Sequence, residues 1–213
     1  FYQASSSEMY GDYPGEKNDD SPFIPRSPYG AAKVFGHHIT NHYREAYNIF
    51  ACCGILFNHE SPLRGLEFVT RKITSTLARI KYKKTNVLKL GNINARRDWG
   101  FAGDYVEAMW LMLQQKNPNN YIISTGESHS VKEFLTLATE FSDLGDWHDF
   151  VQIDESAMRP TDIEDLTGNS IKAQKQLGWK PKTSFKNLVK MMVDHDIEFE
   201  KLHIDPFEFN HKT

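Results

Sequence analysis

Along this chain, apolar runs separated by polar segments predict an alternation of strands and helices. Apolar residues open the chain, a segment rich in Pro, Asp and Gly follows at 12–28, and an apolar run covers 49–57. These segments predict a first strand, a connecting loop and a buried second strand. Apolar spacings of three and four residues predict helices at 29–47, 68–82, 104–115, 131–141, 170–177 and 184–202, with further strands at 87–90 and 121–124. The order indicates an α/β protein with parallel strands.

Two of the predicted helices are defined by a set of apolar positions at helical spacing. In the first helix, which we expect to end at Asn48, the set comprises Val34, Ile39, Tyr43, Ala46 and Tyr47. In the last helix it comprises Leu188, Met191, Met192 and Ile197. We expect the second set to pack in the core.

Charge, hydropathy and cysteine content indicate which kinds of binding partner and which cellular compartment to expect. The 213 residues carry a net charge of −3 and the basic residues are scattered, so charge gives no argument for a nucleic acid or an acidic membrane as partner. No apolar run approaches membrane-spanning length and no signal peptide opens the chain, so we expect a cytoplasmic protein. Cys52 and Cys53, the only cysteines, are neighbours in a predicted buried strand, which favours free thiols over a disulfide or a metal site.

The segment at 27–33 reads Ser-Pro-Tyr-Gly-Ala-Ala-Lys and places Tyr29 and Lys33 four positions apart on one helix face. An ammonium near a phenol stabilises the ionised phenol, which can take a proton from a sugar hydroxyl while a hydride leaves the same carbon. Alone, such a pair is weak evidence. Upstream, the first strand leads into three serines and Glu8, and open α/β sheets place their chemistry at strand ends. On composition alone, Glu8 is more simply an exposed turn carboxylate.

These serines, the Tyr-Gly pair after them and the Tyr-x-x-x-Lys motif resemble the extended short-chain dehydrogenase/reductase family that acts on nucleotide sugars. Further motifs are similar to those of its GDP-mannose 4,6-dehydratase members: GILFNHESP at 54–62, FVTRKI at 68–73, RDWG at 97–100, DYVEAMW at 104–110 and RPT at 159–161. The resemblance covers nearly the whole chain. It implies a Rossmann-like parallel sheet, NADP as cofactor, GDP-mannose as substrate, and assembly as a homo-oligomer, a dimer or tetramer.

The resemblance also implies catalytic roles. Tyr29 would accept the proton of the C4 hydroxyl as hydride passes to the nicotinamide, and Lys33 would bind the nicotinamide ribose and tune Tyr29. Ser6, at a position where Thr is more usual, would hydrogen-bond the C4 oxygen. Glu8 would remove the C5 proton and assist loss of the C6 hydroxyl as water. Return of the hydride to C6 would complete a 4-keto-6-deoxy sugar.

Binding residues follow from the same resemblance. The cofactor would be bound by Tyr29, Lys33, His59 and Arg64. The sugar nucleotide would be bound by Asn58, Lys72, Arg97 and Arg159. The two last arginines would meet the diphosphate, which needs converging cations. Without the resemblance, each of these basic residues would be a solvated surface charge.

Two loops depart from the family pattern. Leu63 and Arg64 stand where two arginines are usual before the glycine, which leaves the choice between NADP and NAD open. At 100–103 the chain reads Gly-Phe-Ala-Gly where the family has Gly-His-Ala-Lys, so two polar groups are lost there.

No Gly-x-Gly-x-x-Gly turn occurs, so we expect the first part of the nucleotide-binding domain to lie outside this sequence. Residues 1–57 would then be the C-terminal part of that domain and carry the catalytic residues. Residues 58–213 would form mainly a smaller, more helical substrate-binding lobe, with some elements returning to the first domain. We expect no turnover from this chain alone. The alternatives are a reductase or epimerase of the same family, or an inactive binding or assembly module.

A group of histidines on the first helix offers a competing site. His38 and His42 have the spacing of paired zinc ligands, with His37 beside them. No glutamate follows the first histidine as that motif requires, and no third ligand is evident. A surface cluster on a solvated helix is therefore the favoured interpretation.

Overall fold

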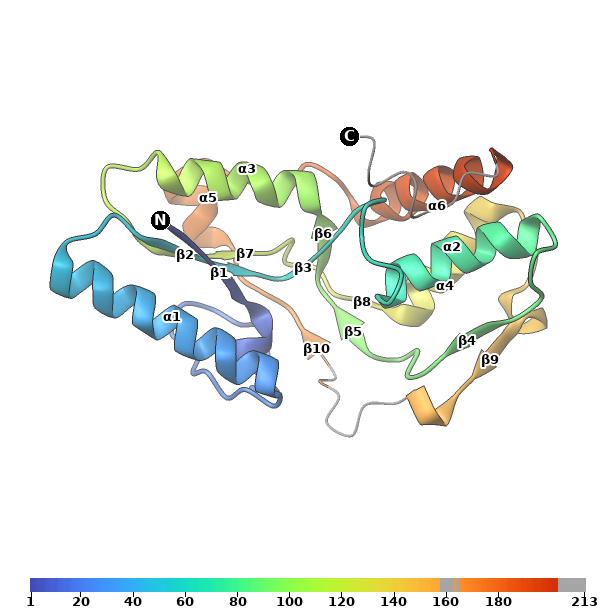
Figure 1. Ribbon diagram of the computed structural model, residues 1–213, viewed down its shortest axis with the longest axis horizontal. Helices are drawn as coiled ribbons and strands as arrows, with labels where there is room; N and C mark the ends of the chain where they lie inside the picture. Colours follow the sequence, from blue (N-terminus) through green and yellow to red (C-terminus); the bar gives the residue numbers. More distant parts are fainter. Residues whose placement is uncertain (158–162, 164, 203–213) are drawn as a thin grey trace. The chain divides into compact units, whose positions relative to one another are not determined.

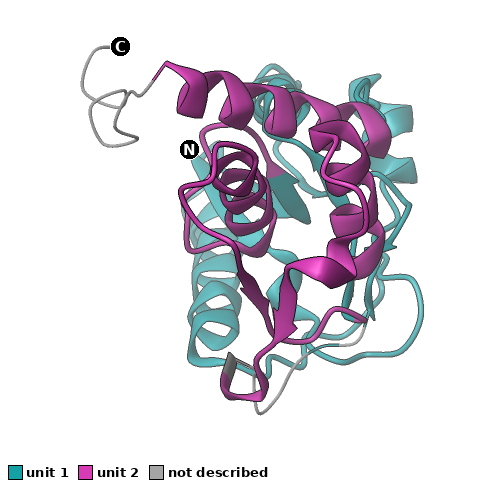
Figure 2. Ribbon diagram, turned by 90° about the vertical axis from the view of Figure 1, so that its right-hand side faces the viewer, with its two compact units in different colours: residues 1–59, 95–129, 159–184 teal, residues 60–94, 130–158, 185–213 magenta. Residues whose placement is uncertain are grey.

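The computed structural model describes residues 1–157, 163 and 165–202 of the chain. They form two compact units, drawn in separate colours in Figure 2. Unit 1 contains Phe1–His59, Ala95–His129 and the described residues of Arg159–Ser184. Unit 2 contains Glu60–Asn94 and the described residues of Ser130–Met158 and Phe185–Thr213. Within the described residues, no helix is both long and apolar enough to span a bilayer.

Unit 1 is built on a parallel sheet in the order β1-β2-β7, which confirms the predicted α/β class. Its strands are β1 (Tyr2–Ser6), β2 (Cys52–Leu56) and β7 (Asn120–Ile123). The 3-10 turn η1 (Ser7–Met9) follows β1, and helix α1 (Pro28–Tyr47) connects β1 to β2. Figure 1 shows α1 on one face of this sheet, with α3 (Ala102–Leu113) and α5 (Ile171–Leu177) on the other.

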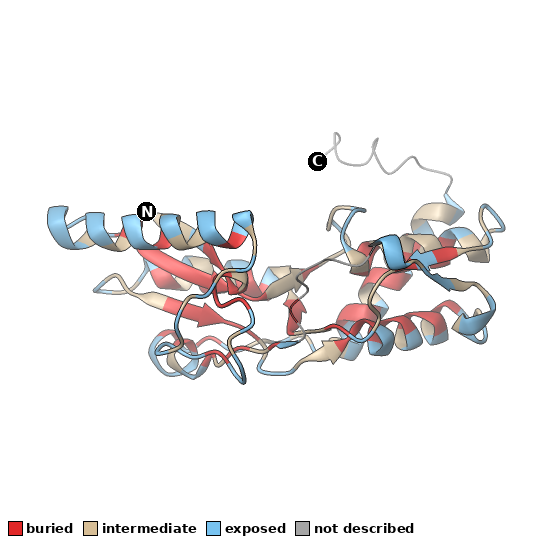
Figure 3. Ribbon diagram, turned by 90° about the horizontal axis from the view of Figure 1, so that it is seen from below, coloured by how far each residue is buried: buried red, intermediate tan, exposed pale blue. Residues whose placement is uncertain are grey.

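Alternate residues of β2 serve two separate hydrophobic cores. Cys52 and Leu56 pack with residues of α3 and α5 in one cluster, whereas Ile55 packs with Met9 and Tyr10 in another. Successive side chains of a strand point to opposite faces of the sheet, so an unbroken apolar run is what a strand covered on both faces requires. Strand β2 is buried throughout, and Figure 3 draws the buried parts of the sheet in red.

Helix α1 begins and ends where the sequence predicts, but its buried face differs from its apolar positions. Ser27 caps the first turn by accepting a hydrogen bond from the Gly30 amide at 3.0 Å, and Asn48 ends the helix in the left-handed region at φ 52°. The buried residues of the helix are Gly30, His37 and Thr40. In contrast, Tyr47 is 65 % exposed. The buried face of this helix is therefore formed by small and polar residues rather than by the predicted apolar set.

The expectation of a solvated histidine cluster is wrong for His37. His37 is 4 % exposed, whereas His38 and His42 are both exposed, as expected. His37 Nδ1 lies 2.9 Å from Ser5 Oγ, and its Nε2 lies 3.4 Å from Asn120 Nδ2. Because an amide nitrogen only donates, Nε2 accepts and the Nδ1 proton is donated to Ser5. Hydrogen bonds to residues of β1 and β7 therefore stabilise this imidazole in the interior.

Among its described residues, unit 2 packs three helices with a parallel strand pair. The helices are α2 (Val69–Lys81), α4 (Val131–Ser142) and α6 (Phe185–Lys201), and the strands are β4 (Leu88–Leu90) and β9 (Val151–Ile153). In α6, Leu188 and Met192 are buried, while Met191 and Ile197 are intermediate. Core packing of the predicted apolar set is therefore confirmed for Leu188 and Met192.

Several short elements lie outside the strands and helices that the sequence pattern predicts. They are β3 (Asn58–Glu60), β5 (Arg96–Arg97), β6 (Trp99–Phe101), β8 (His129–Ser130), β10 (Asp165–Leu166) and the 3-10 turns η2 (Trp147–Asp149) and η3 (Glu155–Ala157). Strands of two or three residues are too short to show an alternating pattern. Strand β10, for example, pairs with β5 in parallel through Asp165 and Leu166 alone.

Candidate active site

The end of β1 brings together the first two predicted catalytic residues. Ser6 is the last residue of the strand and is 9 % exposed. Its hydroxyl accepts a hydrogen bond from the Glu8 amide at 3.2 Å, which turns the chain into η1 directly after the strand. Glu8 itself is partly buried. The serine thus fixes the backbone that carries the carboxylate.

Gly30 allows the first turn of α1 to lie directly against the turn at Glu8. A Cβ atom at Gly30 would come within 2.8 Å of the Glu8 carbonyl oxygen, closer than real Cβ contacts, so only glycine fits here without a shift. Tyr29 immediately precedes this glycine in the helix. A close backbone approach therefore joins the segment that carries the tyrosine to the segment that carries the glutamate.

Tyr29 and Lys33 lie together on this end of α1, as their spacing predicts. The Lys33 Nζ is 5.4 Å from the centroid of the Tyr29 ring and donates a hydrogen bond to the Ala4 carbonyl oxygen at 2.8 Å. The Ala4 carbonyl belongs to β1, so the lysine ties the helix to the strand that ends at Ser6. Tyr29 is 55 % exposed and thus accessible to a ligand.

A buried polar pair links the same strand to the middle of α1. Ser5 is 3 % exposed, and its hydroxyl meets the His37 imidazole as described above. Burial, with lesser contributions from the charges of His38 and Arg44, lowers the pKa of His37 to about 4. The imidazole is therefore neutral at physiological pH and serves as a hydrogen-bonding link between strand and helix.

Residues after β2 include two of the predicted binding residues. Asn58 is partly exposed, and His59 Nδ1 lies 2.9 Å from the Phe57 carbonyl oxygen, to which it must donate. The His59 ring stacks on that of Tyr105, with centroids 5.3 Å apart. Backbone and aromatic contacts therefore fix the orientation of this imidazole.

Arg97 is held within unit 1 by backbone carbonyl groups. Its Nη1 donates to the carbonyl oxygens of Arg96 at 2.8 Å and Ile163 at 2.6 Å. The predicted diphosphate residue Arg159 lies outside the described residues. Helix α3 begins directly after Phe101, which forms no side-chain cap. This is the loop at 100–103 where the sequence departs from the family pattern.

Asp98 is a structural centre within the RDWG motif, and the sequence pattern assigned it no role. Its carboxylate is fully buried and accepts hydrogen bonds from Thr125 N at 2.8 Å, Thr125 Oγ1 at 2.6 Å, Gly126 N at 2.9 Å and Gly168 N at 3.3 Å. Burial raises the pKa of Asp98, and these hydrogen bonds oppose the rise. The sequence pattern gave no signal for this role, because the partners of Asp98 lie 27 to 70 residues further along the chain.

Arg64 belongs to unit 2 and lies against a buried carboxylate. Its Nε lies 3.3 Å from Glu60 Oε2, and its guanidinium carbon lies 3.5 Å from the Phe68 ring centroid. Glu60 is 2 % exposed and also accepts a hydrogen bond from Thr70 Oγ1 at 2.6 Å. Burial raises the pKa of Glu60, while Arg64 and Thr70 oppose the rise.

Lys72 also belongs to unit 2, where it lies on α2 and is partly exposed. Its charge acts on the carboxylate of Asp154. Hydrogen bonds from Ser156 lower the pKa of Asp154, and the charges of Lys89 and Lys72 add smaller contributions. The structure therefore places Arg64 and Lys72 in one unit, and Tyr29, Lys33, Ser6 and Glu8 in the other.

Comparison with known proteins supplies the family. The family model described as GDP-mannose 4,6 dehydratase matches residues 1–192. GDP-mannose 4,6 dehydratase 1 of Arabidopsis thaliana is 57 % identical over 201 residues, which are 94 % of this chain and 55 % of that protein. GDP-mannose 4,6 dehydratase of Dictyostelium discoideum is 50 % identical over 218 residues, covering 94 % of this chain and 61 % of its own length. The chain thus spans little more than half the length of these relatives.

A solved structure confirms the fold. RMD from Pseudomonas aeruginosa, complexed with NADPH, superposes with a TM-score of 0.85 at 20 % identity, covering 93 % of this chain and 66 % of that one. The partial parallel sheet of unit 1 agrees with this partial coverage. With the match of the family model over nine tenths of the sequence and identities of half or more, the chain belongs to the GDP-mannose 4,6-dehydratase family.

Proposed function

We propose that this chain supplies the catalytic residues of a GDP-mannose 4,6-dehydratase, which converts GDP-mannose to GDP-4-keto-6-deoxymannose with loss of water. The observation that carries the proposal is the approach of the α1 first turn to the Glu8 backbone at Gly30. Dehydration needs a base for the C4 hydroxyl and a second base for C5, and this contact brings Tyr29 and Glu8 to one end of the sheet. The relatives named above support the substrate class.

Tyr29 is the base for the C4 hydroxyl in this proposal. Its ring is accessible, and the Lys33 ammonium, hydrogen-bonded to the Ala4 carbonyl oxygen, lies 5.4 Å from the ring centroid. Ser6 keeps its proton and donates a hydrogen bond to the C4 oxygen as that oxygen becomes a carbonyl. In the hydrogen bond from the Glu8 amide, Ser6 Oγ is the acceptor, which leaves the hydroxyl proton of the serine for this role.

Glu8 is the base for the C5 proton. A hydrogen on the carbon beside a ketone is acidic, so this step follows oxidation at C4 rather than preceding it. The same carboxyl group can then protonate the departing C6 hydroxyl, which leaves as water. Because Ser6 and Gly30 fix the Glu8 backbone, the carboxylate is held at the strand end while its side chain stays partly exposed.

The donor set at the start of α1 fits a nicotinamide dinucleotide. A lysine ammonium and a phenol hydroxyl side by side suit the hydroxyl groups of a ribose, and His59 and Arg64 are assigned to the same cofactor. When bound there, NADP would supply the hydride acceptor for C4 and the hydride donor for C6. The Pseudomonas protein of the same fold was solved with NADPH, which supports this class of cofactor. We assign NADP on the family resemblance of the sequence, although Leu63 replaces a usual arginine.

Recognition of the sugar nucleotide is assigned to Asn58, Lys72, Arg97 and Arg159. Two carbonyl groups hold Arg97, so its guanidinium is presented from a fixed position. We expect the complete protein to be a homo-oligomer in the cytoplasm. The two buried free cysteines agree with a reducing compartment.

The test uses this chain preceded by the N-terminal part of the Arabidopsis relative, hereafter the extended protein. We expect it to convert GDP-mannose with loss of one water, detected by mass spectrometry. The 213-residue chain alone should show no turnover, because it contains no Gly-x-Gly-x-x-Gly turn to bind the cofactor and place the nicotinamide beside Tyr29. Glu8→Gln should still permit oxidation at C4, so reduced cofactor should accumulate, seen by its absorbance, without product.

Glu45→Gln is the matched control, because Glu45 is an exposed carboxylate on α1. It should behave as the parent. Release of 4-keto-6-deoxy sugar by the Glu8 variant at the parent rate would show that Glu8 is not the C5 base. Conversion without water loss would indicate the reductase or epimerase alternative, and the absence of both turnover and NADP binding in the extended protein would indicate an inactive assembly module.

A further inference from the structure

Unit 2 contains a buried ion pair that no part of the proposed mechanism uses. Arg71, on α2, is 8 % exposed, and Asp196, on α6, is 3 % exposed. Arg71 Nε lies 3.2 Å from Asp196 Oδ2, and Nη2 lies 2.9 Å from Oδ1, so the pair is bidentate. Thr74 Oγ1 donates to Oδ2 at 2.6 Å, and His195 Nδ1 lies 3.2 Å from Oδ1. The carboxylate thereby fixes the direction of the guanidinium.

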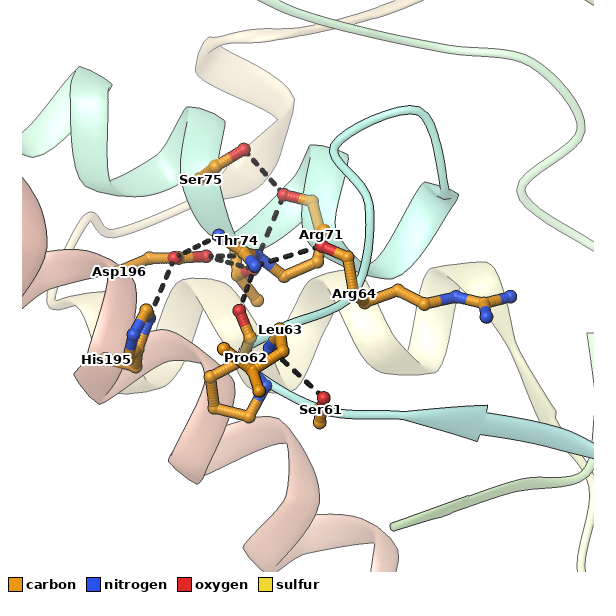
Figure 4. Close-up of polar contacts among 9 residues, drawn as sticks. All are labelled: Ser61, Pro62, Leu63, Arg64, Arg71, Thr74, Ser75, His195 and Asp196. Atoms are coloured by element: carbon orange, nitrogen blue, oxygen red, sulfur yellow. Dashed lines mark hydrogen bonds and ion pairs between the residues drawn. The ribbon is translucent and has the colours of Figure 1, made fainter. Parts of the chain in front are cut away.

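The remaining side of the Arg71 guanidinium binds a loop. Nη1 donates to the carbonyl oxygens of Pro62 and Arg64, the latter at 3.0 Å, as Figure 4 shows. Within the loop, the Leu63 amide donates to the Ser61 hydroxyl at 3.1 Å, and the Arg64 amide donates to the Ser61 carbonyl oxygen at 3.0 Å. The second of these bonds closes a tight turn. Arg71 therefore ties a turn of local hydrogen bonds to helix α2.

The side chain of Arg64 leaves the loop in the opposite direction. Figure 4 shows it directed away from the Arg71 cluster, while its backbone carbonyl points into the cluster. The guanidinium is flanked by the Glu60 carboxylate at 3.3 Å and the Phe68 ring at 3.5 Å, and the side chain is 23 % exposed. Its backbone and its guanidinium are thus oriented by separate groups.

From this arrangement we propose that Arg71, held by Asp196, is a positioning residue that fixes the loop at 61–65 so that Arg64 is presented to an anionic group of the cofactor. The inference rests on the proposed function in one respect, the assignment of Arg64 to the cofactor. The effect of Arg71 on the loop is independent of that assignment.

The geometry requires an arginine at position 71. A guanidinium has five N–H donors in a planar fork, so it can bind a carboxylate with two of them and carbonyl oxygens with another. A lysine at this position would keep the charge and meet the carboxylate at one point, but it could not hold both partners in fixed directions. Arg71→Lys therefore separates positioning from charge.

The first measurement is hydrogen exchange of the 213-residue chain. In Arg71→Lys, amides at 63–65 should exchange at least about tenfold faster than in the parent, while amides in the centre of α4 should exchange as before. Asp196→Asn should give the same pattern through loss of the orienting carboxylate. Thr74→Val, which removes only one hydroxyl contact to Asp196, is a milder variant should both others fail to fold.

Asp194→Asn is the matched control. Asp194 lies on the same helix, and its carboxylate forms an exposed pair with Lys190 at 2.6 Å. This variant should leave the exchange of the loop unchanged. Loop exchange equal to the parent in both Arg71→Lys and Asp196→Asn, or exchange raised equally throughout unit 2, would overturn the positioning role.

The second measurement is NADP binding by the extended protein. Arg64→Ala and Arg71→Lys should each weaken binding by about tenfold, the equivalent of one lost charged hydrogen bond, and the double variant should be little weaker than either alone. This non-additivity is not expected of a residue that affects only stability. Additive losses would overturn the coupling through Arg64. Faster loop exchange in Arg71→Lys with unchanged NADP affinity in Arg64→Ala would instead refute the cofactor assignment of Arg64, not the hold on the loop.

Discussion

The two units hold their predicted functional side chains in different ways. In unit 1, Tyr29 is 55 % exposed, whereas two buried polar residues of the same unit, His37 and Asp98, are hydrogen-bonded to Ser5 and Thr125. In unit 2, Arg64 is itself part of a network, with Glu60 at 3.3 Å and its own carbonyl bound to Arg71. The proposed function of Tyr29 is therefore separate from the buried polar contacts of unit 1, whereas the proposed function of Arg64 is joined to those of unit 2.

The buried carboxylates show the same contrast. Asp98 is satisfied by backbone amides and one hydroxyl, whereas the main partner of Asp196 is a guanidinium. Loss of charge at Asp98 would remove an acceptor from neutral donors, but loss of charge at Asp196 leaves a buried cation without its counter-ion. The difference teaches that a substitution at Tyr29 can separate chemistry from stability, and that a substitution in the Arg71 and Asp196 network will change both the presentation of Arg64 and the stability of unit 2.

The largest expected effect is that of Tyr29→Phe in the extended protein. Removal of the proposed base should lower turnover by about 10²- to 10⁴-fold, the range for positioned acid–base groups. The melting temperature should not change, because Tyr29 is 55 % exposed. Steady-state assays and thermal unfolding measure the two quantities.

Tyr43→Phe is the control for this prediction, since Tyr43 lies on the same helix and is 47 % exposed. It should leave both quantities as in the parent. A fall in melting temperature parallel to the loss of turnover in Tyr29→Phe would break the comparison, because Tyr29 would then be a structural residue like those of unit 2.

The second effect is on stability in unit 1. Asp98→Asn should lower the free energy of unfolding by about 3 kcal/mol, because one carboxylate oxygen is replaced by a donor that faces amide donors. Denaturant unfolding of the 213-residue chain measures it. Asp12→Asn, with a carboxyl side chain 53 % exposed, is the control and should change stability by less than about 0.5 kcal/mol.

Comparison with Asp196→Asn sharpens the contrast between the units. We expect that variant to be the less stable of the two, because Arg71 stays charged and buried. Equal stability of the two variants, or parent-like stability of Asp98→Asn, would show that the kind of partner does not decide the cost of losing a buried carboxylate here.

The smallest effect at neutral pH comes from His37. Its pKa is lowered to about 4 in the folded chain from an ordinary value near 6.5, so the unfolded chain binds more protons between these values. The stability that the neutral imidazole contributes is therefore complete above pH ~6.5 and is lost as pH falls toward ~4, by up to about 3 kcal/mol.

The measurement is the free energy of unfolding of the parent and of His37→Gln between these pH values. The variant should show the flatter dependence, and His42→Gln, on the exposed side of α1, should follow the parent. Asp98 and Glu60 have raised pKa values, so their contribution is lost as pH rises, with the opposite sign. The parent and both histidine variants contain these carboxyl groups. If the free energy of unfolding changed equally with pH in the parent and in His37→Gln, the role of His37 would therefore be contradicted.

The order and type of the long elements were predictable because apolar spacing records which surfaces must be covered. Helix α2 was predicted at 68–82 and spans Val69–Lys81, and α6 was predicted at 184–202 and spans Phe185–Lys201. Asn48 was expected to end α1 and does so, while the Ser27 cap of its first turn is a finding of the structure. Strand β2 is shorter than the apolar run that predicted it, and it pairs with β1 and β7 over Cys52–Leu56.

The candidate site was predictable in part. Spacing alone placed Tyr29 and Lys33 together, and the structure confirms their proximity at 5.4 Å from ammonium to ring centroid. The functional roles of these residues came from the family resemblance and stay predictions. Asp98 and Arg71 were not singled out, because a charged residue in a sequence gives no sign of burial when its partners lie far along the chain.

The sequence by itself determined the α/β class, the succession of long helices and strands, the Tyr-x-x-x-Lys pair and the family. Each of these rests on local spacing, on caps or on contiguous motifs, which a linear chain expresses directly. Tertiary structure alone decided which polar groups are buried: Lys17 bonds to the carbonyl of Asp165, Asp98 to the amide of Gly168 and Arg71 to Asp196. Such groups are stable in the interior only with partners supplied by distant segments, and it is folding that brings those partners within reach.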